Sequence, residues 1–267
     1  MVKRRVPVAI GMVALTLVCC LWGPIPRLTF LLCCGLAATW ETWHILAKSG
    51  EGVYVAILLL FVLSCGMLSA VHANLTAYVA AFVLAAHLIL AWGALTYREG
   101  RGKTALASLT ALAYPGSLFA ALLYVSQLER WLWPFAVGQL TAWICDSAAL
   151  IVGKKWGRHH LSTPVSPHKT MEGCVAGAAA ALPTGLLCWA LFRSACPLSL
   201  WAWMLLCLIC SSWGQLGDLA ASLVKRAVGA KDFSNLLGPH GGVMDKFDSM
   251  VFSIPLAYFC LRIMGVM

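Results

Sequence analysis

The amino-acid sequence predicts an all-α integral membrane protein, a bundle of about nine transmembrane helices. Hydrophobic residues make up 61% of the 267 residues, whereas charged residues make up only 11%. Since a water-soluble domain carries about a quarter charged residues, most of the outer surface is expected to face lipid. The apolar residues also fall into runs of roughly 20, the length that an α-helix needs to cross a bilayer.

These apolar runs set the expected domain organisation. The expected spans are residues 6–22, 28–47, 53–73, 75–97, 104–126, 132–153, 173–192, 198–221 and 247–266. We group them into an N-terminal region of transmembrane helices, residues 1–131, and a C-terminal region, residues 132–267, that holds the candidate active site. The first run follows Met1–Arg5 as in a signal peptide, but Gly23-Pro24-Ile25-Pro26 stands where a small-residue cleavage site would be. We therefore expect a retained first helix.

The distribution of positive charge predicts that the N-terminus lies in the cytoplasm. With that orientation, 15 of the 19 Lys and Arg residues fall in cytoplasmic segments and the other four fall outside. Cytoplasmic loops of membrane proteins are enriched in Lys and Arg. The net charge of +9 is therefore assigned to these loops and to anionic lipid headgroups. A nucleic-acid partner is not expected, because the sequence shows no DNA- or RNA-binding motif.

The twelve cysteines do not indicate a zinc site. Most lie inside apolar runs, where a free cysteine packs as a small hydrophobic side chain. Cys207 and Cys210 have the spacing of a metal-binding pair, but no histidine or second cysteine pair lies near them in a polar loop. A structural zinc ion takes four such ligands.

Acidic residues concentrate in the C-terminal region, which also has two long polar loops predicted to be cytoplasmic, residues 153–172 and 222–246. Six of the ten acids follow residue 145: Asp146, Glu172, Asp218, Asp232, Asp245 and Asp248. An acid at membrane depth costs several kcal/mol unless it is paired or faces water. The default interpretation is a functional site. The alternative is a set of buried ion pairs that hold the bundle together.

The spacing of these acids predicts two helix ends that converge on one point. Asp218, Ser222 and Lys225 recur at i, i+4 and i+7, so they share a face if their helix continues to Arg226. Asp245 and Asp248 likewise share a face at the start of the ninth helix. Just before them stands His240-Gly241-Gly242. A glycine pair ahead of a helix lets backbone amides approach a ligand, and a helix N-terminus favours phosphate.

Carboxylates beside several cations suit phosphoryl or nucleotidyl transfer. Mg²⁺ takes one or two carboxylates together with phosphate oxygens, and Lys225, Arg226 and Lys231 would neutralise the remaining phosphate charge. The alternative is a basic loop that only binds anionic headgroups, which explains the cations but not the aspartates among them. The first polar loop, with the run Ser166-Pro167-His168-Lys169-Thr170 followed by Glu172-Gly173, adds candidates on the same membrane side: Ser166, Lys169, Thr170 and Glu172.

Other polar residues of the apolar runs are given no functional role. Glu41 and His44 lie one helical turn apart in the second span, where they are interpreted as a polar pair within the bundle. A lone histidine on an apolar helix, such as His87, is interpreted as a bundle residue.

The C-terminal half resembles the phosphatidate cytidylyltransferase (CDP-diglyceride synthase) family. The resemblance rests on Ser222-x-x-Lys225-Arg226-x4-Lys231-Asp232-x-Ser234-x2-Leu237-Gly238-x-His240-Gly241-Gly242-Val243-x-Asp245-Lys246-Phe247-Asp248. A second matching segment is Asp146 to Gly173, with Ser166-Pro167, Lys169-Thr170 and Glu172-Gly173. One residue departs from the pattern: the family usually has Arg where this chain has Lys246, which keeps the charge but not the bidentate fork.

The resemblance implies that CTP and phosphatidate react to give CDP-diacylglycerol and pyrophosphate. It implies Mg²⁺, with K⁺ as a candidate second cation, a homodimer, and a bacterial inner membrane with the active site facing the cytoplasm. Carried onto this chain, Asp218 and Asp245 would be the metal ligands. Phosphate contacts would come from Lys225, Arg226, Lys231 and His240, and Ser222 and Asp248 would orient these groups. The wider set of expected substrate-binding residues is Asp146, Ser166, Lys169, Thr170, Glu172, Gly241, Gly242 and Lys246.

Two other functions remain open at this point. One is transport of an anionic solute, with Asp146 and Asp218 as coupling groups. Transporters tend to place such sites near the membrane midplane and to carry inverted repeats, whereas no repeat is visible here and the acids gather toward one face. The other keeps an enzyme but changes the substrate to another lipid phosphate, or the reaction to that of a related lipid kinase.

Overall fold

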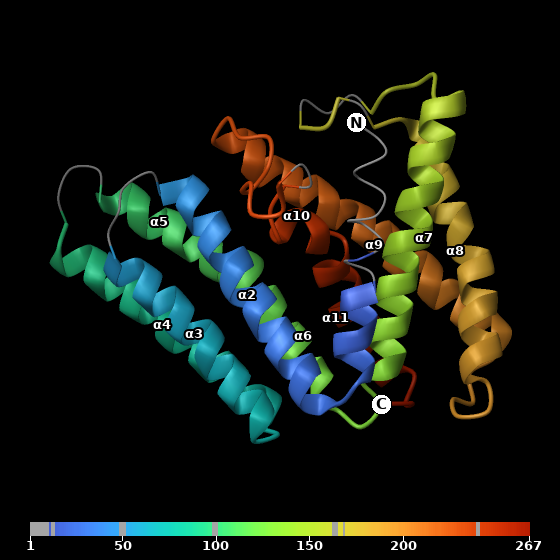
Figure 1. The fold of residues 1–267 in the computed structure, drawn as a ribbon, viewed down its shortest axis with the longest axis horizontal. Helices are drawn as coiled ribbons and strands as arrows, with labels where there is room; N and C mark the ends of the chain where they lie inside the picture. Colours follow the sequence, from blue (N-terminus) through green and yellow to red (C-terminus); the bar gives the residue numbers. More distant parts are fainter. Residues whose placement is uncertain are drawn as a thin grey trace. The chain divides into compact units, whose positions relative to one another are not determined.

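The chain folds into α-helices joined by loops (Figure 1). The computed structural model describes residues 11, 14–47, 52–97, 101–161, 165–167, 169–238 and 241–267. Within these ranges it contains no β-strand, and an isolated β-bridge pairs His160 with Thr170. The expected all-α class is confirmed.

Seven helical segments in the described ranges are long and apolar enough to cross a bilayer. They are α2 (Pro24–Ala47), α3 (Gly52–Ala70), α4 (Leu75–Leu95), the combined segment Gly102–Ser126, α7 (Leu132–Trp156), α8 (Met171–Phe192) and α9 (Leu200–Ala227). The combined segment consists of α5 (Arg101–Ala111), the π-helical η1 (Leu112–Gly116) and α6 (Ser117–Ser126). The protein is therefore an integral membrane protein, as the hydropathy predicted.

The first and last expected spans differ from these seven. Residues 14–21 are helical, while much of the expected span 6–22 lies outside the described residues. At the other end, the short helix α10 (Met244–Phe247) and a turn at Asp248–Ser249 precede α11 (Met250–Ile263), which has 14 residues. At 1.5 Å per residue, α11 is about 21 Å long, less than the roughly 30 Å of a hydrocarbon core. The expected span 247–266 is thus shorter than predicted, because its first residues form a polar turn.

Side-chain caps explain where several helices begin. Asn74 accepts a hydrogen bond from the Ala77 amide at 3.1 Å, Thr170 from Gly173 at 3.2 Å, and Ser199 from Ala202 at 3.3 Å. Such caps satisfy amides that have no partner inside the helix. Asn74 therefore separates α3 from α4, although the polar break in the sequence is short at that point.

Two compact units make up the chain. Unit 1 comprises residues 1–128 together with 230–246, and unit 2 comprises residues 129–229 together with 247–267. Most of the second polar loop therefore packs with the N-terminal helices. Helix α9 continues to Ala227, so residues 222–227 are helical and the loop proper begins later than predicted.

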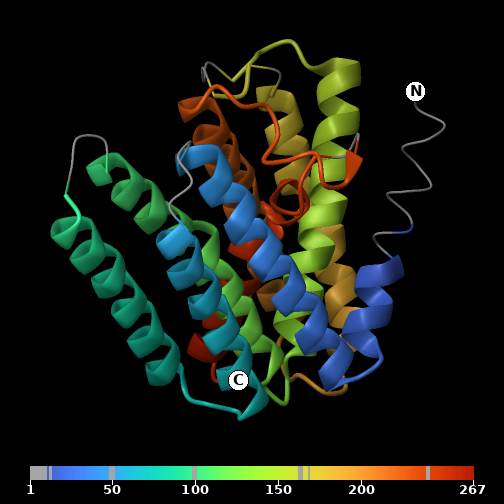
Figure 2. The same cartoon turned by 60° about the vertical axis from the view of Figure 1, so that its left-hand side comes forward.

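Unit 1 packs α2 against α3, α5 and α6, while α4 runs beside α3 (Figures 1 and 2). Its core is apolar and fully buried around Leu31, Tyr54, Leu58, Leu112 and Phe119. Inside this unit, α2 carries one acid, Glu41, and α3 to α6 carry none. The mostly apolar surface of these helices suits a lipid environment.

Unit 2 is a bundle of α7, α8, α9 and α11, in which α7 and α8 run side by side (Figure 2). Trp203, Leu206, Val137 and Leu261 are buried at its centre. Gly217 lets α9 approach the start of α11 closely, since a Cβ there would lie 2.6 Å from the Asp248 carbonyl oxygen. Small residues allow such close helix contacts in membranes, and this contact brings the following residue, Asp218, near Asp248.

Candidate active site

Three aspartates and two lysines gather in unit 2. Asp146 comes from α7, Asp218 and Lys225 from α9, and Asp248 from the turn before α11. The Ser249 hydroxyl donates a hydrogen bond to Asp146 Oδ2 at 3.2 Å. Lys169 Nζ, from the loop ahead of α8, lies 2.7 Å from Asp218 Oδ2. The structure thus brings together groups that are up to 102 positions apart in the chain, from Asp146 to Asp248.

The other charged groups of this cluster shift the pKa of Asp248. Burial raises the pKa of its carboxyl above the ordinary range, the nearby carboxylates of Asp218 and Asp146 raise the pKa further, and Lys225 lowers it. Asp248 Oδ1 accepts a hydrogen bond from the Ser249 amide at 2.8 Å. Because three carboxylates lie within each other's field, the cluster favours an additional positive charge.

Helix α9 positions the cluster as the spacing predicted. It is continuous from Leu200 to Ala227, so Asp218, Ser222 and Lys225 lie on the same helix face. Lys225 is buried and Ser222 half-buried, whereas Arg226 is exposed. The end of α9 therefore directs Asp218 and Lys225 together into unit 2.

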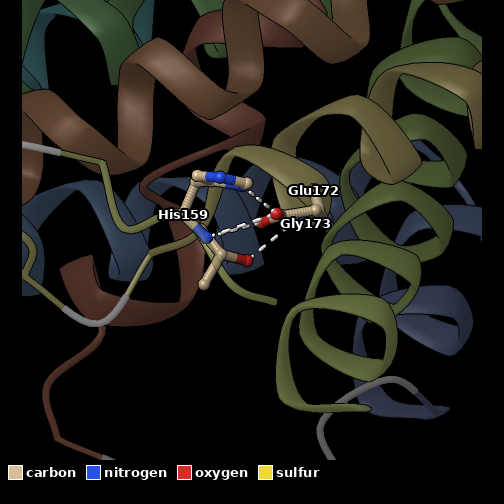
Figure 3. A network of polar contacts seen from close by, with 4 residues as sticks. His159, Glu172 and Gly173 are labelled. Atoms are coloured by element: carbon tan, nitrogen blue, oxygen red, sulfur yellow. Dashed lines mark hydrogen bonds and ion pairs between the residues drawn. The ribbon is translucent and has the colours of Figure 1, made fainter. Parts of the chain in front are cut away.

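The first polar loop is held by its own contacts. The Leu161 amide donates to the Lys169 carbonyl at 2.7 Å, and the Met171 amide to the His159 carbonyl at 2.8 Å. Glu172 Oε1 lies 2.6 Å from His159 Nδ1, and both Glu172 oxygens accept from the His159 amide, at 3.2 and 3.3 Å (Figure 3). These contacts fix the backbone of Lys169, whose ammonium group reaches Asp218.

Several predicted substrate-binding residues of this loop have structural partners. Thr170 caps α8, Glu172 bonds His159, and the Ser166 carbonyl accepts from the Lys169 amide at 3.2 Å. Their roles toward substrate stay predictions. His168 lies outside the described residues.

The second polar segment is organised in unit 1 by two carboxylates. Asp245 Oδ2 accepts hydrogen bonds from the Phe233 amide at 2.8 Å and from the Gly242 amide at 2.9 Å. Glu41, from α2, accepts from the Ser234 hydroxyl at 2.6 Å and from the Val243 and Met244 amides at 3.0 Å each. The amides of Phe233, Gly242, Val243 and Met244 thus donate to protein carboxylates in this structure.

Backbone conformation and close packing explain why glycines stand at positions 241 and 242. Gly241 has φ +81° and donates its amide to the Gly238 carbonyl at 3.2 Å. A Cβ on Gly242 would lie 2.5 Å from Glu41 Oε2. Only a residue without a side chain allows this approach. The predicted contact of Gly241 and Gly242 with substrate stays a prediction. His240 lies outside the described residues.

The other predicted site residues of this segment have less defined surroundings. Lys231 is exposed and Lys246 is half-buried, with its amide donating to the Val243 carbonyl at 3.0 Å. The two predicted metal ligands belong to different units, Asp218 to unit 2 and Asp245 to unit 1.

Comparison with known proteins adds the family. The model of the family described as "Cytidylyltransferase family" matches residues 3–264. The chain belongs to this family. Among curated relatives, a phosphatidate cytidylyltransferase of Staphylococcus haemolyticus is 40% identical over 117 residues, and one of Bacillus subtilis is 39% identical over 121 residues. These matches cover 44% and 45% of this chain and span 44% of the length of each relative.

The cytidylyltransferase family membership directs attention to metal ligands. Among the described residues, no group of three or more His, Cys, Asp or Glu side chains is placed to hold a metal ion. Mg²⁺ does not require such a group, because it is bound through one or two carboxylates plus waters and substrate phosphates. The oxygen-only donor set and the excess negative charge around Asp218 and Asp248 fit this hard cation.

Glu41 of α2 is a partner of the second polar segment that sequence reasoning missed. It was expected to pair with His44, but it is fully buried against residues 234–244, while the ring of His44 stacks on Trp40 at 5.1 Å. The available signal was an acid inside an apolar helix, a position where ionisable residues are usually functional. Its partner lies about 200 positions away in the sequence, which helix periodicity does not reveal.

Proposed function

We propose that this protein transfers a cytidylyl group from CTP to phosphatidate, giving CDP-diacylglycerol and pyrophosphate. Membership of the cytidylyltransferase family supports the nucleotide chemistry, and relatives carrying the name phosphatidate cytidylyltransferase support the lipid substrate. The observation that carries the proposal is the cluster of Asp146, Asp218 and Asp248 with Lys169 and Lys225. A membrane-embedded enzyme with such a site can meet a lipid phosphate at the bilayer surface and a soluble nucleotide in the same place.

The reaction needs positioning more than proton transfer. A phosphate oxygen of phosphatidate attacks the α-phosphorus of CTP, and the bond from that phosphorus to the bridging oxygen breaks as pyrophosphate leaves. The attacking phosphate is already ionised at neutral pH, so a strong general base is not required. Holding the two phosphates in line lowers the barrier by removing translational and rotational freedom beforehand.

Charge neutralisation is the second contribution of the protein. Lys169 and Lys225 in the cluster would offset the charge of the triphosphate. The phosphate contacts predicted for Arg226 and Lys231 are part of the same proposal. Asp218, with Asp248 beside it, would hold Mg²⁺, which when bound supplies electrostatic stabilisation of the leaving pyrophosphate. The role of Asp245 as a second metal ligand stays a prediction. K⁺ as a second cation and a homodimer are part of the same proposal.

The proposed location is the bacterial inner membrane, with the active site facing the cytoplasm. The bias of Lys and Arg toward the segments assigned to the cytoplasm supports this orientation. CTP is a cytoplasmic metabolite, and the proposed site would then meet it directly. Labelling of single-cysteine variants from either side of intact membrane vesicles tests the assignment.

The decisive test is an assay of the purified protein with defined substrates. CTP and phosphatidate in detergent micelles containing Mg²⁺ should yield pyrophosphate and CDP-diacylglycerol in equal amounts, and omission of either substrate should abolish both products. Failure to form a CDP-lipid would overturn the proposal. Uptake of an anionic solute into vesicles without CTP would instead support transport, and pyrophosphate release with a different lipid phosphate would redirect the substrate assignment.

A further inference from the structure

Glu41 connects a transmembrane helix of unit 1 to the polar segment that carries Asp245. It is fully buried in α2, as are its neighbours Thr39 and Thr42. Burying a carboxylate is costly unless its oxygens are hydrogen-bonded. Here both oxygens are used, Oε1 by Ser234 and Val243 and Oε2 by Met244.

The pattern of donors specifies a carboxylate at this position. Two backbone amides and a hydroxyl donate to it, and the two amides, which can only donate, require an acceptor oxygen on each side of the Glu41 carboxylate. A glutamine of the same shape has one acceptor oxygen and an NH₂ group that only donates. Glu41→Gln would therefore set a donor against a backbone N–H, although the volume of the side chain would not change.

The backbone of the loop lies close to the Glu41 carboxylate. Gly242, with no Cβ, lies against the Glu41 carboxylate, and its amide donates to Asp245 Oδ2. The amides of the next two residues donate to Glu41. Glu41 and Asp245 thus accept from four backbone amides, at residues 233 and 242–244, and from the Ser234 hydroxyl. These bonds fix the backbone from which Asp245 and Lys246 extend.

We propose that Glu41 is a positioning residue for cytidylyl transfer. It holds the 233–246 segment in the conformation that the reaction uses, without itself touching substrate. The inference rests on the proposed function and deepens it: a residue of an N-terminal helix, far from the sequence signature, sets the geometry of that signature. Loss of Glu41 should therefore reduce the rate of the chemical step more than it reduces substrate binding.

Two variants on the same helix separate this role from general stability. Glu41→Gln keeps size and burial but loses acceptors, whereas Thr39→Val alters another fully buried polar side chain of α2, whose hydroxyl has no hydrogen-bond partner among the described residues. We expect kcat of Glu41→Gln to fall by about 10- to 100-fold, as for the loss of one or two hydrogen bonds to a charged group. The KM values for CTP and phosphatidate should change by less than about threefold, and Thr39→Val should retain wild-type kinetics.

A second measurement reports on the segment without using activity. Hydrogen–deuterium exchange of peptides covering residues 233–247 should be faster in Glu41→Gln than in the wild type, because the Val243 and Met244 amides lose their acceptor. The exchange of α7 and α9 peptides should be unchanged. If Glu41→Gln fails to fold, Ser234→Ala removes one of the same hydrogen bonds from the loop side and should show both effects at smaller size.

The outcomes distinguish this inference from the proposed function. If exchange is unchanged in both Glu41→Gln and Ser234→Ala, the inference that Glu41 holds the loop by hydrogen bonds is overturned. Faster exchange with wild-type kcat would overturn the positioning role. Absence of CDP-diacylglycerol formation by the wild-type protein would overturn the proposed function and, with it, the catalytic consequence, while the exchange comparison would still decide whether Glu41 holds the segment.

Discussion

Lys169 Nζ lies 2.7 Å from Asp218 Oδ2, an ion pair between the loop ahead of α8 and the cytoplasm-directed end of α9 in our proposed topology. Both side chains are partly exposed, at 24% and 32%, so solvent screens the pair and its worth is modest. Asp218 is also the residue to which we assign Mg²⁺. The lysine therefore occupies the carboxylate that the cation would bind, and the two positive charges compete for it.

This competition gives a prediction for Lys169→Met. Removal of the ammonium group should raise the affinity of the protein for Mg²⁺ or Mn²⁺ by roughly two- to fivefold, the value of a partly exposed ion pair, while turnover decreases because a phosphate-neutralising charge is lost. Mn²⁺ titration followed by electron paramagnetic resonance measures the first effect. Weaker metal binding in Lys169→Met would contradict the competition.

Asp218→Asn should abolish turnover while the protein still inserts and folds. The substitution removes the negative charge that would hold the cation but keeps the size of the side chain. Kinetic assays should show a decrease of at least about 100-fold, in the range found for loss of a key electrostatic group. Glu129→Gln, which neutralises an exposed acid of unit 2 away from the cluster, serves as the matched control and should keep wild-type activity. Near-normal turnover of purified Asp218→Asn would remove Asp218 from the metal site.

Asp248→Asn should stabilise the metal-free protein at higher pH. Because the folded-state pKa of Asp248 is raised, the folded state binds more protons than the unfolded state, and stability falls as pH rises above the ordinary aspartate range near 4. The variant has no carboxyl group at this position, so its stability lacks this dependence on pH. In EDTA, its melting temperature should exceed that of the wild type at pH 8, and the difference should disappear as the pH approaches 4.

The melting temperatures can contradict this prediction directly, and Mg²⁺ provides a control. A wild type whose melting temperature follows that of Asp248→Asn at every pH would show that burial of this carboxyl costs nothing. Addition of Mg²⁺ at pH 8 should reduce the difference, because a cation in the cluster offsets the repulsion among the three carboxylates.

Gly242→Ala should disrupt the loop through a single methyl group. The added Cβ would lie 2.5 Å from Glu41 Oε2 and 2.7 Å from Glu41 Cδ, so the segment must shift away from its acceptors. We expect activity to fall by about 10-fold or more, comparable to the loss of a hydrogen bond to a charged group. Gly52→Ala, where a Cβ meets nothing within 4 Å, should behave like the wild type. Equal activity of the two variants would contradict the packing of the loop on Glu41.

The sequence by itself determined the class of protein and its family. Hydropathy alone places α2 to α9, because a lipid environment forces each crossing segment to satisfy its backbone internally and to present apolar side chains. Helical spacing placed Asp218, Ser222 and Lys225 on one face of α9, since this relation depends only on local geometry. The signature residues led to the cytidylyltransferase family, which the family match confirms.

Only the tertiary structure decided which distant residues meet. The partners of Asp146, Asp218 and Glu41 are Ser249, Lys169 and the loop around Val243, and no periodicity in the sequence connects them. Local rules also predicted that amides at the glycine pair face a phosphate, which stays a prediction. In the structure, the Gly241 amide donates to the Gly238 carbonyl, the Gly242 amide to Asp245, and the next two amides to Glu41. The physical reason is that an isolated sequence motif cannot show that a carboxylate from another helix already satisfies its donors.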